Sequence, residues 1–549
     1  MRGRGFMVEA ALVALALIPA PARALRVTTW NLLNYTDANS SAPTNTMTSR
    51  QGYFQTVFSS LATDVVIVQE LKTPTAADSF LYHVLRAAQP SKKWGGGAAT
   101  FLSGAESAVY YDSALVAVSN VASFSTGGPR QVLVCLVKPV GYVSGKAWFR
   151  LYSMHLKAGG PGTSDSTTRR TECTAIRNTL NTAPAGTNLL LGGDSNFYGA
   201  YEGGYQRLTE SQADNDGRLK DPYDMPGDWH VIAGYAAYDT QCPCLTGCNT
   251  TLGFSGGGMD DRFDLMLGSY SLNDAQGLDA VPGGTFAFGN DGNHFDRDIN
   301  GGGFNTAVGI AVANALHEAA DHLPVVCTLQ LPSRVVAASA VSFGTVIVGA
   351  AAQQSLAVAD GVPLPGDGLD YSFSAPVGFT APAGPFIAAA GAAPNAHTLT
   401  MDASATGAKG GTLALATDDP DSATKNVLLS GLVVRHAVAS LDSLTGVMNQ
   451  LVDLGTHAPG GFPDTTRSVF DLGYDAQQAR LAVNSGVLTG DDGRFSIVGG
   501  FHAALAGPAG APYMVHFDDS GATPDSTYEA TLTFTNSDEP LPGAQPEST

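Results

Sequence analysis

Over residues 25–332, short apolar runs alternate with amphipathic stretches. Runs such as "TDVVIVQE" and "TNLLLGG" predict buried strands, whereas "SRQGYFQTVFSSLA" and "TRRTECTAIRNTLN" predict helices. Strands that alternate with helices are typical of an α/β domain, in which the helices cover the faces of the sheets. We therefore expect residues 25–332 to form an α/β domain.

The pattern changes at Ser333. Short alternating strands such as "VSFGTVIVG" and "GTLALATDD" follow, separated by Gly, Pro and Asp turns, and helical periodicity almost disappears. A second block with this pattern begins near Arg435. Because a chain of 549 residues is too long for a single core, we expect two all-β immunoglobulin-like sandwich domains, residues 333–434 and 435–549, the latter with a frayed tail.

Residues 1–24 have the pattern of a secretory signal peptide. Arg2 and Arg4 precede an apolar stretch of about 14 residues, and Ala22-Arg23-Ala24 forms a small-residue cleavage site. The stretch is too short to span a membrane, and no later segment is long and apolar enough to do so. We therefore expect an exported chain without a transmembrane segment, secreted or associated with the cell surface or wall through its β-domains.

Export permits disulfides, and all 6 cysteines lie in the part predicted to be α/β. Their spacing does not choose the pairing. The cluster "CPCLTGC" fits either a disulfide that closes a loop or a metal knuckle. Zinc needs four ligands and the expected compartment is oxidising, so the disulfide is favoured.

The net charge of the chain is −20. Residues 25–332 contain 19 Lys and Arg against 27 Asp and Glu, a net charge of −8, and residues 333–549 contain 7 against 21, a net charge of −14. The basic footprint of a nucleic-acid-binding chain is therefore absent. A polyanionic substrate would have to be held by local arginines and metal ions.

Polar side chains stand at the ends of several predicted strands. In "NLLLGGDSNFYG", three leucines stop on two glycines, and a carboxylate and an amide follow at once. Each such residue alone fits an ordinary turn. Together they predict a site, because open α/β sheets place ligands at the ends of their strands. The set consists of Asn31, Glu70, His155, Asp194, Asn196, Asp264, Asp321 and His322.

The motifs that carry these residues are "WNLLNY", "VQE", "MHLKAG", "GGDSN", "RFDLML" and "DHLPV", in that order. The set resembles the endonuclease/exonuclease/phosphatase superfamily, which is deoxyribonuclease-I-like, and "GGGMDDRFDLMLGS" with "GNDGNHFD" resembles its secreted bacterial branch. The two β-blocks resemble immunoglobulin-like modules found beside choice-of-anchor segments. The resemblance implies a four-layered α/β sandwich, with two packed mixed sheets flanked by helices, and a divalent-metal phosphoesterase site.

The resemblance also implies roles for the residues. Glu70 is the first metal ligand, with Asn31 and Asp321, and the ion is Mg²⁺, with Ca²⁺ or Mn²⁺ as alternatives, since hard cations prefer oxygen ligands. Asp194 orients or deprotonates the attacking water, and His322 is held by Asp264. The remaining implied roles are phosphate binding by Asn31, Arg130 and Asn196, and a second catalytic imidazole at His155.

For several residues near this set, the sequence leaves alternative interpretations open. Arg130 also fits a surface salt bridge, and Tyr111 fits a core position. Asp260 and Asp261 would repel phosphate unless a metal or Arg262 offsets their charge.

Two further groups of charged residues invite an interpretation. Arg169 and Glu172 lie three apart on a predicted helix and fit an ion pair with each other. The segment with Asp291, His294 and Asp296 fits a flexible polar loop better than a second cation site.

The sequence therefore predicts a secreted, metal-dependent phosphodiesterase, with extracellular nucleic acid as the favoured substrate. The same site would serve a phospholipid hydrolase of the sphingomyelinase kind or a hydrolase of small phosphoesters, because fold does not fix substrate. A surface adhesin with an inactive hydrolase-like domain is the alternative from another class. The complete set of polar strand-end residues argues against a decayed enzyme.

Overall fold

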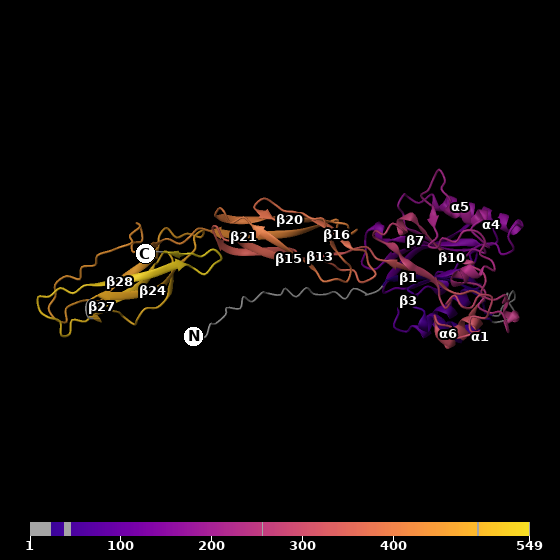
Figure 1. The fold of residues 1–549 in the computed structure, drawn as a ribbon, viewed down its shortest axis with the longest axis horizontal. Helices are drawn as coiled ribbons and strands as arrows, with labels where there is room; N and C mark the ends of the chain where they lie inside the picture. Colours follow the sequence, from indigo (N-terminus) through magenta and orange to yellow (C-terminus); the bar gives the residue numbers. More distant parts are fainter. Residues whose placement is uncertain (1–23, 38–45, 255, 491–492, 548–549) are drawn as a thin grey trace.

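The computed structural model describes residues 24–37, 46–254, 256–490 and 493–547, so the predicted signal peptide lies outside the described residues except for Ala24. Figure 1 shows an α/β region at one end of an elongated molecule and two β-rich regions in a row beside it. The α/β region carries the candidate chemistry.

Two six-stranded sheets form the centre of the α/β region. The first runs in the order β11 (Asp279–Ala287), β12 (Val325–Gln330), β1 (Leu25–Tyr35), β2 (Val65–Leu71), β4 (Ala108–Asp112) and β3 (Trp94–Gly95). The second runs in the order β5 (Val116–Ser125), β6 (Gln131–Pro139), β7 (Phe149–His155), β8 (Leu189–Asp194), β10 (Asp264–Ser269) and β9 (Leu219–Lys220). The pairs β1–β2 and β7–β8 are parallel, and the other neighbours are antiparallel, so both sheets are mixed.

The continuous apolar runs belong to strands that are buried on both faces. In β8, Leu190 packs in the core between the two sheets, while Leu189 and Leu191 pack in the core under the helices of the second sheet. In β2, Ile67 and Val68 divide in the same way between the inter-sheet core and the outer core of the first sheet. The result is a layered α/β arrangement, as the sequence predicts for this part of the chain.

Helices cover the outer faces of both sheets. The first sheet is covered by α1 (Thr46–Ser60), α2 (Pro74–Ser79), a π-helical turn η1 (Phe80–Leu85), α3 (Arg86–Ala88) and α6 (Gly309–Ala319), and the second by α4 (Ser164–Leu180) and α5 (Gly203–Thr209). Short 3₁₀ turns are η2 (Gly97–Ala99), η3 (Gly145–Ala147), η4 (Ala233–Tyr238), η5 (Thr250–Leu252) and η6 (Tyr270–Leu272).

The two glycines that end the leucine run allow backbones and sheets to approach closely. A Cβ on Gly192 would lie 2.4 Å from Met266 Sδ and 3.1 Å from Ile67 Cδ1, which belongs to the opposite sheet. Gly193 has a φ of +135°, and a Cβ there would lie 1.9 Å from the carbonyl oxygen of Met154. Both positions require glycine, and they bring the end of β8 against β7 and the first sheet.

The residues from β13 onward form four sheets in two pairs. The middle region pairs a sheet of β13 (Val335–Ala337), β15 (Ala352–Asp360), β19 (Asn395–Met401) and β17 (Phe379–Thr380) with one of β14 (Ala340–Ile347), β21 (Thr424–Val434), β20 (Gly407–Thr417), β16 (Leu369–Ser374) and β18 (Phe386–Ala388). The distal region pairs β22 (Ala439–Ser440), β23 (Thr465–Asp471), β27 (Ala511–Phe517) and β25 (Phe495–Ile497) with β26 (Ala504–Ala506), β24 (Leu481–Gly490), β28 (Ala530–Asp538) and β29 (Pro546–Glu547). Each pair of sheets has its own core. The immunoglobulin-like classification stays a prediction.

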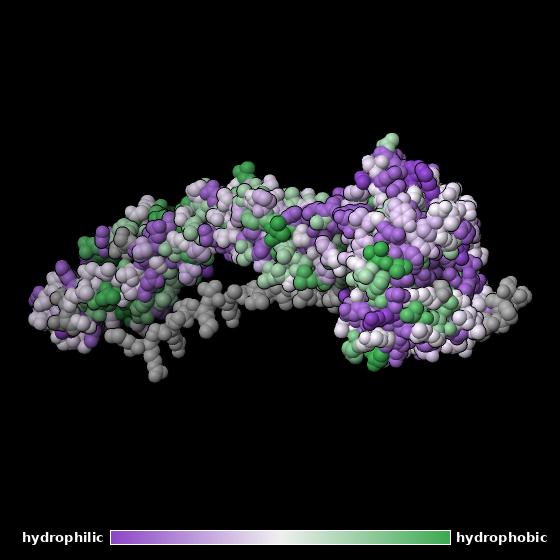
Figure 2. Space-filling model, turned by 45° about the vertical axis from the view of Figure 1, so that its right-hand side comes forward, coloured by the Kyte–Doolittle hydropathy of each residue, from purple (hydrophilic) through white to green (hydrophobic). Residues whose placement is uncertain are grey.

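The α/β and middle regions contact each other through polar groups. Tyr142 Oη donates to the carbonyl of Pro332 over 2.6 Å, and Arg334 Nη2 donates to the carbonyl of Gly141 over 2.8 Å while its guanidinium lies over the Tyr142 ring. Among the described residues, no helix has the length and apolar character needed to cross a bilayer. On the face shown in Figure 2, hydrophobic surface occurs as separate patches over all three regions.

The cysteine cluster forms the favoured disulfide. Cys244 and Cys248 are bonded to each other, whereas Cys242 is free and buried. Asp298 and His317 lie close to Cys244. Asp298 accepts hydrogen bonds from the backbone amides of Leu245 and Thr246, so it fixes the disulfide loop.

Candidate active site

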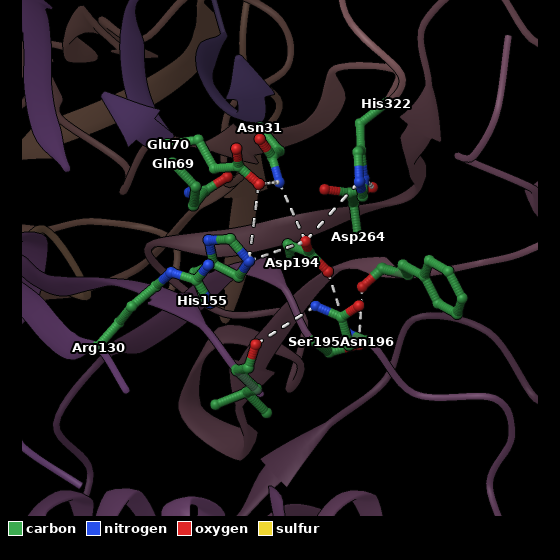
Figure 3. Close-up of polar contacts among 12 residues, drawn as sticks. Asn31, Gln69, Glu70, Arg130, His155, Asp194, Ser195, Asn196, Asp264 and His322 are labelled. Atoms are coloured by element: carbon green, nitrogen blue, oxygen red, sulfur yellow. Dashed lines mark hydrogen bonds and ion pairs between the residues drawn. The ribbon is translucent and has the colours of Figure 1, made fainter. Parts of the chain in front are cut away.

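Polar side chains from both sheets meet at one edge of the two-sheet core. Register brings them there: Asp194, the last residue of β8, pairs with His155 at the end of β7 and with Asp264 at the start of the antiparallel β10. Asn31 in β1 lies opposite Gln69 in β2, one residue before Glu70. Figure 3 shows these side chains pointing toward one another. The structure thus brings together the strand-end residues that the sequence singles out.

Asn31 links the carboxylates of the two sheets. Its Nδ2 donates to Glu70 Oε1 over 3.1 Å and to Asp194 Oδ2 over 3.0 Å (Figure 3). Its Oδ1 accepts from the amide of Leu33 over 3.0 Å. The side chain is fully buried. Asn31 therefore orients two carboxylates, and its predicted contacts with metal and phosphate stay predictions.

His155 lies between the same two carboxylates. Its Nε2 is 3.4 Å from Asp194 Oδ2 and 3.9 Å from Glu70 Oε1. Burial lowers the pKa of His155 to about 4, although both carboxylates raise it. Its Nδ1 is buried and has no hydrogen-bond partner among the described residues. The imidazole is therefore neutral at pH 7.

His322 forms a close pair with Asp264. Its Nδ1 is 2.7 Å from Asp264 Oδ2, its backbone carbonyl accepts from Trp30 Nε1, and its Nε2 is 3.7 Å from Asp194 Oδ2. Burial opposes the charged form, but Asp264 and Asp194 outweigh burial and raise the pKa of His322 well above its ordinary value. The carboxylate fixes the ring, and Nε2 then lies between Gln241 Nε2, at 2.9 Å, and Asp194 Oδ2, at 3.7 Å.

Asp194 is the centre of the site. Its Oδ2 faces Asn31 and both imidazoles, and its Oδ1 accepts from the amide of Asn196 over 3.0 Å. Burial raises the pKa of Asp194, and His322 and His155 oppose this shift. The Asn196 side chain donates to the carbonyl of Leu156 over 3.3 Å. Asn196, with a φ of +52°, holds a left-handed backbone conformation that is uncommon outside glycine and clusters at functional sites.

Glu70 provides an ionised carboxylate at the mouth of the site. Burial would raise its pKa, but His155, Lys72, Asn31 and the amide of Asn34 outweigh burial and lower the pKa to about 2. Its side chain keeps 15% of its surface exposed.

The carboxylate of Asp321 lies 3.9 Å from His322 Nε2. Glu70 and Asp321 are hard oxygen donors, so the donor set fits Mg²⁺, Ca²⁺ or Mn²⁺. The specific ligands stay a prediction.

Cationic side chains border the site beside Glu70 and His155. Lys72 Nζ and Arg130 Nε share Glu106 Oε2, at 2.7 and 3.5 Å. Arg130 lies close enough to His155 to help lower its pKa. Arg130 thus stands at the rim and also makes a salt bridge, so the two interpretations of this residue are compatible; its phosphate contact stays a prediction.

Three of the secondary interpretations have an outcome. Arg169 does not pair with Glu172: it makes a buried bidentate pair with Glu202, at 2.9 and 2.8 Å, because the start of α5 packs against α4. Tyr111 packs against the inter-sheet core. Asp291 bonds His294 Nδ1 over 2.8 Å and the amide of Thr306, so hydrogen bonds order this segment.

Two glutamines contact the site and are not predicted from the sequence. Gln241 Nε2 lies 2.9 Å from His322 Nε2, and Gln69 Nε2 donates to Ser153 Oγ over 2.8 Å. Gln69 stands next to Glu70 in "VQE", which is a usable signal. Gln241 directly precedes the cysteine cluster and reaches His322 because its backbone bridges Asp261 and His322.

No family model matches this chain, and no curated protein matches it. Several solved structures are similar to part of it. D. rerio TDP2 complexed with a single-strand DNA product is 15% identical, with a TM-score of 0.36, over 56% of this chain and 99% of that one. SmcL is 14% identical, with a TM-score of 0.35, over 56% and 98%. An endonuclease/exonuclease/phosphatase family protein from Bacteroides thetaiotaomicron is 15% identical, with a TM-score of 0.33, over 56% and 98%. A function for this chain is argued from its own side chains.

Proposed function

We propose that this protein is an exported, divalent-metal-dependent phosphodiesterase that hydrolyses extracellular nucleic acid. The observation that carries the proposal is the environment of Asp194. One carboxylate oxygen lies 3.0 Å from an amide donor, 3.4 Å from one imidazole and 3.7 Å from a second. Such a set of acid, base and donor groups is what hydrolysis of a phosphodiester requires.

Asp194 is the residue that orients and deprotonates the attacking water. Its raised pKa makes it a stronger base than an exposed aspartate, and Asn31 and the Asn196 amide hold its two oxygens in place. His322, charged and fixed by Asp264, donates its Nε2 proton toward a phosphoryl oxygen or the leaving oxygen. Neutral His155 hydrogen-bonds the same phosphoryl group from the other side.

Glu70 and Asp321 are the residues that would hold the cation, next to the amide of Asn31. When bound, a hard divalent cation supplies neutralisation of the phosphoryl charge and polarisation of the attacking water. The residues fit this role because Glu70 is ionised far below pH 7 and keeps an exposed edge.

The charge around the site supports a substrate with several phosphates. Lys72, Arg130 and Lys157 lie on the β2, β6 and β7 side, and their side chains are 23%, 23% and 38% exposed. Phosphates that flank the scissile bond would meet these cations. Glu106 and Asp165 offset part of this charge. A phospholipid head group carries only one phosphate, so several cations near the site favour nucleic acid.

Export and surface retention complete the proposal. The N-terminal pattern supports export, and the two β-rich regions, which extend away from the α/β region (Figure 1), would serve as spacers or surface contacts.

The test is cleavage of supercoiled plasmid by the purified chain, with Mg²⁺ and with EDTA, next to the Asp194→Ala variant. Sphingomyelin vesicles and bis-p-nitrophenyl phosphate are assayed in parallel. We expect plasmid nicking that needs the metal and disappears in the variant. Hydrolysis of sphingomyelin or of the small diester without nicking would reject the nucleic-acid substrate, and no hydrolysis by folded protein would reject the enzyme.

A further inference from the structure

Three side chains form a second cluster beside the catalytic residues. One ligand atom from each of His230, Asp260 and Asp261 lies within 4.8 Å of the others. Backbone bonds fix the cluster, because the amide of Val231 donates to the carbonyl of Asp260 over 2.9 Å and the amide of Gln241 donates to that of Asp261 over 3.0 Å. Backbone hydrogen bonds therefore hold the segments that carry the cluster together.

The basic residue next in the chain does not neutralise these carboxylates. Arg262 turns away and is fully occupied by Asp221, with Nη1 and Nη2 at 2.9 and 2.8 Å from its oxygens. The guanidinium is also enclosed by the rings of Tyr223 and Trp229. Arg262 therefore does not offset Asp260 and Asp261. His230 offsets part of their charge, since its Nδ1 lies 2.8 Å from Asp261 Oδ1.

A buried, unpartnered aspartate acts on the same two carboxylates. Asp239 is 0% exposed, and neither of its oxygens has a hydrogen-bond partner among the described residues. Burial raises its pKa to about 8, and the negative charges of Asp261 and Asp260 add to this shift. A buried carboxyl with no donor is costly unless a positive charge is near, and Asp296 adds further negative charge beside Asp260.

We propose that His230, Asp260 and Asp261 bind a second divalent cation, distinct from the one held at Glu70. Imidazole with two carboxylates suits Mn²⁺ or Zn²⁺, whereas Mg²⁺ and Ca²⁺ prefer oxygen ligands alone. The exposed imidazole, 46% open to solvent, gives the ion a path of entry.

A cation at this position would affect the proposed function, and this part of the inference rests on that function. Asp261 interacts electrostatically with His322, and Gln241 joins the two segments by contacts with both. A bound cation would remove negative charge from the side of the site opposite Lys72 and Arg130. An anionic substrate would then meet less repulsion as it approaches His322.

The test is isothermal titration calorimetry of the purified full chain with MnCl₂ and, separately, ZnCl₂, without substrate. Wild type, Glu70→Gln and the double variant Asp260→Asn/Asp261→Asn are compared. We expect two sites in wild type and one in each variant, with at least a tenfold loss of affinity at the altered site. A double variant that binds like wild type would overturn the proposal.

A second variant keeps the proposal falsifiable if the double variant does not fold. His230→Ala alters an exposed side chain, and we expect it to weaken Mn²⁺ and Zn²⁺ at this site by at least tenfold. Unchanged affinity for both ions would overturn the proposal, since it excludes the imidazole as a ligand. The proposed function fails on a different result: a chain that binds both ions but hydrolyses no phosphoester would reject the enzyme and keep the second site.

Discussion

The α/β region and the β-rich regions both bury histidines and aspartates, but they use them differently. In the α/β region, His155 is 5% exposed, leaves Nδ1 without a partner among the described residues and faces two carboxylates. In the middle region, His397 is 7% exposed, and its Nε2 lies 2.6 Å from Tyr371 Oη among aromatic rings. Burial lowers the pKa of both imidazoles.

The aspartates repeat this contrast. Asp194 contacts Asn31 of β1, His155 of β7 and His322, which precedes β12. Asp360 and Asp471, at the ends of strands, instead accept from the backbone amides of Arg334 and Val438. Burial of a polar side chain therefore does not mark a site. A site is marked by several buried polar side chains that converge and only partly neutralise one another's charges.

The largest expected effect is the loss of Asp194. Asp194→Asn keeps the shape but removes the base, so we expect the hydrolysis rate to fall by roughly 10³-fold or more. Asp471→Asn is the matched control in the distal region, with activity within about twofold of wild type. Steady-state rates on plasmid and on a small diester measure the activity of both variants. Equal activity of the two variants would contradict the difference in role between Asp194 and Asp471.

A second matched pair separates the two buried histidines. His155→Gln removes an imidazole that faces two carboxylates, and we expect kcat to fall by about 10²-fold. His397→Gln weakens the contact with Tyr371 and costs about 1 kcal/mol of unfolding free energy, without loss of kcat. Kinetics and thermal melts of both variants are needed, and a kcat loss in His397→Gln would contradict the separation of roles.

A smaller effect is expected at the rim. Arg130→Ala removes a cation beside His155, so we expect KM for nucleic acid to rise by about tenfold and its salt dependence to decrease. Arg480→Ala removes an exposed arginine that pairs with Glu539 in the distal region, at 2.9 Å, and serves as the control. If KM is the same in both variants at every salt concentration, Arg130 makes only a salt bridge.

The smallest effect is a pH dependence that belongs to the β-rich regions. Burial raises the pKa of Asp360, Asp367 and Asp471 to about 6. Their folded forms bind protons more tightly than the unfolded chain, so this share of stability is present below pH 4 and is lost as the pH rises through about 6.

Asp471→Asn mimics the protonated form and isolates this share. We expect the variant to melt above wild type by roughly 1–3 °C at pH 7, and the difference to vanish near pH 5. Calorimetric Tm values of both chains from pH 5 to pH 8 measure it. A difference that grows toward low pH would reverse the sign and contradict the assignment.

The sequence predicts the site better than its surroundings. Strand-end residues such as Glu70 and Asp194 follow apolar runs, and pairing with a neighbouring strand brings each of them to one edge of the sheets. The hydrophobic pattern and the order of the strands are therefore enough to predict that these residues meet. Side-chain partners that lie on different loops cannot be predicted in this way. Glu202 for Arg169 and Asp221 for Arg262 depend on how later segments pack, and local spacing pointed to Glu172 instead.

The family resemblance implies that the two sheets pack together, but the sequence does not predict which residues meet between them. The glycines before Asp194 predict a bend, but not that Gly192 lies against Ile67 of the opposite sheet. Gln241 shows the same limit, since no local pattern in the segment before the cysteine cluster directs this glutamine to His322.

The most direct measurement is hydrolysis of bis-p-nitrophenyl phosphate by the purified chain as Mg²⁺ is titrated, for wild type and Glu70→Gln. A catalytic site at the strand ends predicts saturable activation in wild type, loss in EDTA and a fall of roughly 10²-fold or more in the variant. Activity that persists in EDTA, or that is equal in the two chains, would contradict a metal-dependent site at Glu70.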